Sequence, residues 1–80
     1  MKDILKVYID DRDKAVRSMD VKKFRKFCKK WKTPNIPPDE VLEITMRKLL
    51  YNIYSATDEE RNIAKEWLES RGYSTSLKED

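Results

Sequence analysis

The positions of glycine and proline constrain the fold of this chain more than any other feature of its sequence. Gly72 is the only glycine, and the three prolines all lie between residues 34 and 38. Turns rich in these residues recur about every 8–12 positions in a β sandwich or barrel. The chain of 80 residues therefore lacks the turn signals of an all-β fold. At this length we expect one domain, residues 1–80.

Apolar periodicity and capping residues predict four helices. These cover roughly residues 3–17, 21–32, 38–54 and 58–71, and we expect the polar tail over 74–80 to be frayed. Asp20 is typical of an N-cap, and Thr57 with Glu60 has the spacing of a capping box. Gly72 suits a left-handed position after the last helix, and Pro38 suits the first position of the third. The fold class predicted from these signals is all-α, a compact small bundle of about four helices.

The first helix has a competing interpretation. Its inner face would carry Ile4, Leu5, Tyr8, Ile9, Arg12, Ala15, Val16 and Met19. The polar stretch 10–13 could instead form a turn, with Leu5, Val7 and Ile9 alternating as a short strand. Because the sequence offers no second convincing strand to pair with it, we favour the helix.

Missing residue types exclude several kinds of chemistry. The chain has no histidine and one cysteine, Cys28. These absences exclude Ser-His-Asp and Cys-His catalysis, an internal disulfide and a cysteine-based zinc site. Cys28 falls on the apolar face of the second helix, where a thiol packs as a small hydrophobe. We expect a protein that is not an enzyme and has no cofactor, metal or small-molecule substrate.

An acidic cluster in the first helix could hold a cation such as Mg²⁺ by carboxylates alone, as could distant acids that the fold brings together. It consists of Asp10, Asp11 and Asp13. The pattern of a calcium loop is absent, because no glycine stands at the turn and no bidentate glutamate is in register. We therefore expect a solvated acidic patch, or ion pairs with Lys14 and Arg17.

The modest net charge of +3 conceals a strong asymmetry along the chain. Residues 1–13 carry a net charge of −1, residues 14–32 carry +8 and residues 33–80 carry −4. On a helical wheel, the apolar residues of the second helix fall within roughly 120°; they are Val21, Phe24, Phe27, Cys28 and Trp31. The opposite half of the wheel, here called the basic arc, contains no acid. It consists of Lys22, Lys23, Arg25, Lys26, Lys29, Lys30 and Lys32.

The basic arc has three interpretations. Closely spaced ammonium groups displace counterions from phosphates, which makes the arc a candidate nucleic-acid surface. The strongest candidates for phosphate contacts are Lys22, Lys26, Lys29 and Lys30. A simpler interpretation is a solvated helix face that acids of the third and fourth helices neutralise in part. A helix lying on a membrane or in a partner's groove would have to expose its aromatic residues, which would leave the other helices little core.

Two segments of the second half carry a family resemblance. Residues 37–44 (PPDEVLEI) and 66–73 (EWLESRGY) resemble small reading frames in phages and prophages of Gram-positive bacteria, and residues 15–31 are similar in character. The resemblance covers much of the chain and includes no catalytic motif. It implies a phage-type accessory protein and assigns a role to no individual residue.

The binding of another macromolecule is the function that these observations favour. The leading expectation is interaction with a protein partner or self-association, and nucleic-acid binding through the basic arc is the alternative. The N-terminal region is interrupted by Asp3, Lys6 and Asp10, and no apolar run is longer than that of residues 49–51. We therefore expect neither a secretory signal nor a membrane span, and we expect a cytoplasmic location.

Overall fold

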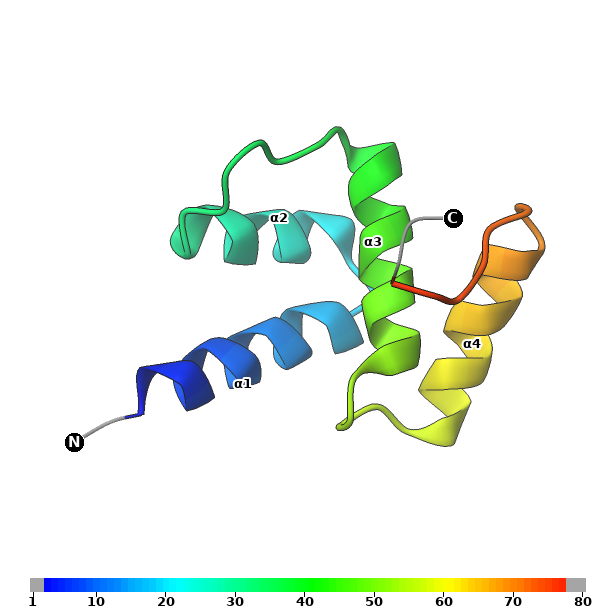
Figure 1. The fold of residues 1–80 in the computed structure, drawn as a ribbon, viewed down its shortest axis with the longest axis horizontal. Helices are drawn as coiled ribbons and strands as arrows, with labels where there is room; N and C mark the ends of the chain where they lie inside the picture. Colours follow the sequence, from blue (N-terminus) through cyan, green and yellow to red (C-terminus); the bar gives the residue numbers. More distant parts are fainter. Residues whose placement is uncertain (1–2, 78–80) are drawn as a thin grey trace.

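Four α-helices make up the computed structural model, which describes residues 3–77 (Figure 1). They are α1 (Ile4–Arg17), α2 (Val21–Lys30), α3 (Asp39–Asn52) and α4 (Asp58–Glu69). No strand occurs among the described residues. The prediction of a small all-α bundle is confirmed. The alternative strand over Leu5, Val7 and Ile9 is wrong, because all three residues lie within α1.

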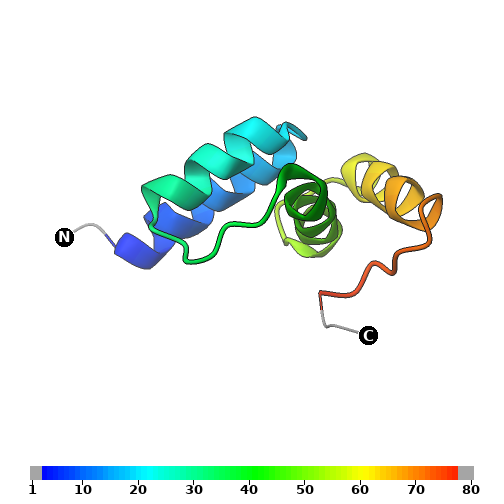
Figure 2. The same ribbon diagram turned by 90° about the horizontal axis from the view of Figure 1, so that it is seen from above.

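The helices form two antiparallel pairs that meet at α3. α1 and α2 run side by side in opposite directions, and α3 crosses their ends, with α4 along its far side (Figure 1 and Figure 2). α3 contacts all three other helices. The largest fully buried side chains are Val16, Met46, Leu50 and Leu68, two of them from α3. The core is therefore centred on α3.

The first turns of α1 extend beyond this core. Ile4 is 72% exposed and Leu5 is 62% exposed, and Ile9 is exposed as well. Tyr8 is half-buried, and its ring centroid lies 5.2 Å from that of Trp31. Because α2 ends just before Trp31, it does not reach the first turn of α1 (Figure 1). The expectation that Ile4, Leu5 and Ile9 lie on a buried face is therefore wrong.

Both ends of α4 follow the signals present in the sequence. The Thr57 hydroxyl accepts from the Glu60 N–H at 3.1 Å, and the Glu60 carboxylate accepts from the Thr57 N–H at 2.9 Å, which completes the capping box. Gly72 adopts a left-handed φ of 79°. The Tyr73 N–H then donates to the Leu68 carbonyl at 2.9 Å. This Schellman closure ends α4 slightly before the predicted boundary at residue 71.

The third helix is shorter than predicted at both ends. Pro38 is its N-cap rather than its first residue, because a ψ of 159° keeps Pro38 extended. The helix ends at Asn52 instead of residue 54, since Ile53 is again extended with a ψ of 145°. Each of these two helix ends is set by the backbone angles of one residue, and the pattern of side chains in the sequence does not reveal those angles.

The segment after α4 folds back towards α3 (Figure 1). The side-chain amide of Asn52 donates to the Thr75 carbonyl at 2.7 Å. Ser74 and Thr75 are half-buried. The beginning of the tail for which we predicted fraying is thus held against α3, and residues 78–80 of that tail lie outside the described residues.

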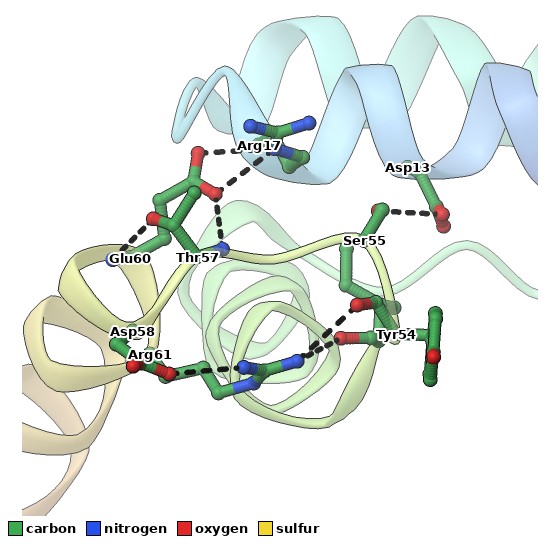
Figure 3. Close-up of polar contacts among 9 residues, drawn as sticks. Asp13, Arg17, Tyr54, Ser55, Thr57, Asp58, Glu60 and Arg61 are labelled. Atoms are coloured by element: carbon green, nitrogen blue, oxygen red, sulfur yellow. Dashed lines mark hydrogen bonds and ion pairs between the residues drawn. The ribbon is translucent and has the colours of Figure 1, made fainter.

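The loop between α3 and α4 is fastened to its surroundings by polar contacts (Figure 3). Arg17 of α1 donates through Nε to both carboxylate oxygens of Glu60, at 2.9 and 3.1 Å. Ser55 donates to the Asp13 carboxylate at 2.8 Å. Arg61 donates to two carbonyls of the loop, at 3.1 and 3.3 Å. Arg17 therefore has a structural role, although it belongs to the strongly basic segment 14–32.

The Glu60 carboxylate makes the stability of this fold depend on pH. The hydrogen bond from the Thr57 N–H is the largest cause that lowers the pKa of Glu60, and Arg17 lowers it further. A depressed folded pKa contributes stability that is complete above the unfolded pKa and is lost as the pH falls through the folded pKa. We therefore expect the urea midpoint, followed by far-UV circular dichroism, to be constant from about pH 7 to 5 and to fall below about pH 4.

The Glu60→Gln variant isolates this contribution, because glutamine cannot take up the proton. It should be less stable than the wild type near neutral pH and should lose less stability on acidification. Parallel acid profiles for the two proteins would show that Glu60 does not carry the pH dependence assigned to it.

Candidate nucleic-acid interface

α2, which carries the basic arc, is closed by caps at both ends. The Asp20 carboxylate accepts from the Lys22 N–H at 2.9 Å, so the interpretation of Asp20 as an N-cap is confirmed. At the other end Lys32 adopts a left-handed φ of 55°, and the Thr33 N–H donates to the Cys28 carbonyl at 2.9 Å. This closure places the last two residues of the predicted helix 21–32 in a turn.

The apolar face of α2 is part of the core. Phe24, Phe27 and Cys28 are all at least nine-tenths buried. Burial is the largest cause that raises the pKa of the Cys28 thiol, which favours the unreactive protonated form. A membrane-surface role for α2 would require the buried rings to be exposed. Within the described residues, no helix has both the length and the apolar composition needed to cross a bilayer.

Two cations of the basic arc are committed to neighbouring helices. Arg25 pairs with Asp39 of α3 at 2.6 Å. Lys30 pairs with Asp11 of α1, also at 2.6 Å, and the Trp31 indole N–H donates to the same carboxylate oxygen at 3.2 Å. The hydrogen bond from Lys30 is the largest cause that lowers the pKa of Asp11. Each of these two cations therefore has an acidic partner on a neighbouring helix, although with the Lys30 and Asp39 side chains 64% and 59% exposed the pairs add little to stability.

The other five cations, which we call the lysine face, point away from the core. They are Lys22, Lys23, Lys26 and Lys29 of α2 and Lys32 of the turn that follows it, and all are exposed. None of them forms an ion pair within residues 3–77. Lys22, Lys26 and Lys29 share one stripe of the helix, over a length of about 10 Å.

Acids of the later helices leave the lysine face uncompensated. Among the described ion pairs, Asp39 of α3 is the one acid from α3 or α4 that reaches α2, and it binds Arg25. Glu60 of α4 binds Arg17 instead. Partial neutralisation of the basic arc therefore occurs at Arg25 and Lys30, and the other five cations of the arc have no ion pair within the described residues.

The acidic cluster of α1 is divided among different partners. Asp11 pairs with Lys30 of α2, and Asp13 pairs with Arg12 at 3.0 Å. Across residues 3–77, no group of three or more acidic or cysteine side chains is arranged to hold a metal ion. The ion pairs expected with Lys14 and Arg17 are not among those of the described chain, because α2 and the α3–α4 loop compete for the same carboxylates.

Lys14 of α1 also belongs to this surface, although it is not among the residues predicted for it from the sequence. It lines the groove between α1 and α2 together with Lys23 and Lys26. In an antiparallel helix pair, residues equally far from the connecting turn face each other. Lys14 lies five residues before Met19 of the connecting turn and Lys23 lies four residues after it, a near symmetry that is visible in the sequence once the two helices are known to pair.

The resemblance to phage and prophage proteins predicts a genomic context, and it stays a prediction. Geometry and charge alone must identify the role of the lysine face, because no protein-family model, no curated protein and no solved structure matches this chain.

Proposed function

We propose that this protein binds nucleic acid through the lysine face of α2, by contacts to phosphate groups and without a chemical reaction. The observation that carries the proposal is the set of five exposed lysines that have no acidic partner within the described chain. Lysine provides a compact point charge that suits phosphate, whereas bidentate reading of guanine favours arginine. The one arginine of the basic arc, Arg25, is held by Asp39. Binding should therefore depend little on base sequence.

The expectation from the sequence placed a protein partner first and nucleic acid second, and the present proposal reverses that order. A surface that only keeps a helix hydrated normally intersperses both signs of charge. The lysine face contains one sign of charge, and among the described ion pairs the two acids that reach α2 bind Arg25 and Lys30 instead. Concentrated positive charge of this kind attracts the phosphate backbone at long range.

Salt dependence of binding to fluorescent oligonucleotides tests the proposal. If each of the five lysines neutralises one phosphate, the logarithm of the affinity for a duplex should fall with the logarithm of salt concentration with a slope of about −4.5. Fluorescence polarisation should then show roughly 500-fold weaker binding at 200 mM than at 50 mM salt. Absence of binding at the lower salt, or binding that salt leaves unchanged, would overturn the proposal.

A second candidate function is self-association through the start of α1. Its support is the exposure of Ile4 and Leu5, at 72% and 62%. Lys6 and Asp10 are also exposed on α1. Antiparallel pairing of two α1 helices would bring Lys6 of one copy near Asp10 of the other, which is the charge complementarity that selects a second copy as partner. The apolar patch is small for a stable dimer, so the association would be weak.

Sedimentation equilibrium measures this association directly. We expect the wild type to show a monomer–dimer equilibrium at concentrations of about 0.1–1 mM. Leu5→Glu places a charge in the apolar patch and should leave only monomer, whereas Leu77→Glu, at another exposed leucine, should keep the wild-type equilibrium. A wild type that remains monomeric across this range would remove the second candidate.

A further inference from the structure

The groove between α1 and α2 is a separate feature at the edge of the lysine face. Its volume is about 290 Å³, and it is lined by Asp11, Lys14, Ala15, Ser18, Lys23 and Lys26. Three lysine side chains therefore line one concave site from two helices. The volume leaves room for a tetrahedral phosphate group.

The charge of this groove is positive because its one acid is already engaged. Asp11 accepts from Lys30 at 2.6 Å and from the Trp31 indole at 3.2 Å through the same oxygen. By contrast, Lys14, Lys23 and Lys26 are exposed and form no ion pair in the part of the chain that the structure describes.

The remaining polar side chain of the groove is fixed in place. Ser18 donates from its hydroxyl to the Ala15 carbonyl at 2.6 Å, and the same oxygen accepts from the Asp20 N–H at 3.2 Å. These bonds belong to the turn between α1 and α2. Binding of an anion in the groove would therefore rest on the three lysines, whose backbones are positioned by that turn and by the packing of the two helices.

We propose that this groove seats one phosphate group, held by Lys14, Lys23 and Lys26. Each ammonium group offers three donors, and charge-assisted hydrogen bonds to phosphate oxygens are stronger than neutral ones. The inference rests on the proposed function for its ligand, a backbone phosphate of nucleic acid. It adds Lys14, so that the path of the nucleic acid crosses from α2 onto α1.

The first test compares single lysine variants in the oligonucleotide titration. Lys14→Ala removes one of the three cations that share the phosphate, so it should weaken duplex binding about two- to fivefold at 50 mM salt. The salt slope should change little, because Lys23 and Lys26 still hold the phosphate. Lys65→Ala removes an exposed lysine of α4 and should leave both quantities unchanged. Alanine is a good helix former, so both variants should fold, which circular dichroism checks. Identical duplex affinities for the two variants at 50 mM salt, with wild-type binding intact, would overturn the phosphate seat and leave the proposed function standing.

The second test uses inorganic tripolyphosphate as a free phosphate source and follows the backbone amides by NMR. The seat predicts shifts concentrated around Lys14, Lys23 and Lys26, and their loss in Lys14→Ala. If the shifts appear there while oligonucleotides fail to bind, the seat holds a free phosphate and the proposed function is wrong. Shifts spread evenly along α2, or no shifts at any accessible concentration, would overturn the seat itself.

Discussion

Replacement of Leu50 by alanine is expected to lower the free energy of unfolding by about 2–5 kcal/mol. Leu50 lies on α3 and its side chain is completely buried. Truncation removes apolar contacts and leaves a cavity that rigid neighbours fill only in part. Because α3 contacts all three other helices, the loss is felt by both helix pairs.

The expected loss in the free energy of unfolding is large compared with the total stability of so short a chain. A domain of this length has a total stability of about 4–12 kcal/mol. Leu50→Ala should therefore be largely unfolded at a urea concentration that leaves the wild type folded, as measured by far-UV circular dichroism. Leu5→Ala is the matched control, since Leu5 is 62% exposed, and should change stability by less than about 0.5 kcal/mol. Similar costs for the two variants would contradict a core centred on α3.

Sequence signals predicted the local parts of this fold well. The N-cap at Asp20, the capping box of Thr57 and Glu60, and the left-handed Gly72 are all present. Each depends on residues within a few positions of one another. Helix ends were predicted less accurately, because a closure such as the one at Lys32 depends on backbone angles that any of several residues can adopt.

Burial along α1 could not be predicted, since it depends on how far α2 extends. The apolar period places Ile4 and Leu5 on the same side as Val16, yet Val16 is completely buried and the other two are exposed. A helical pattern identifies a face, and only the length of the neighbouring helix decides how much of that face is covered.

The basic residues of the candidate site could be predicted from the sequence, but which of them form ion pairs with acids could not. Segregation of charge is a property of the twelve consecutive residues 21–32 and is visible without a structure. The pairing of Arg25 with Asp39 and of Lys30 with Asp11 joins residues 14 and 19 positions apart. Such contacts arise from the packing of α2 against α1 and α3, which no periodicity specifies.

Reversal of three charges on the lysine face should have the largest effect on function. We expect one triple variant, which combines Lys22→Glu, Lys26→Glu and Lys29→Glu, to bind a duplex at least about 1000-fold more weakly than the wild type at 50 mM salt. Three phosphate contacts are lost in this variant and three repulsive charges are added. All three residues are exposed, and glutamate favours helix, so α2 should stay folded. Fluorescence polarisation measures the affinity, and circular dichroism checks the fold.

A control with the same net charge separates a local contact from general electrostatic attraction. Reversal of Lys6, Lys48 and Lys65 to glutamate also changes the net charge from +3 to −3, but it leaves α2 intact. A localised site predicts that this control retains most of the duplex affinity and nearly the wild-type salt slope, since each slope unit counts a phosphate contact rather than total charge. Equal losses in the two variants would mean that nucleic acid responds to the overall charge of the protein, and the lysine face of α2 would then be no more than a hydrated surface.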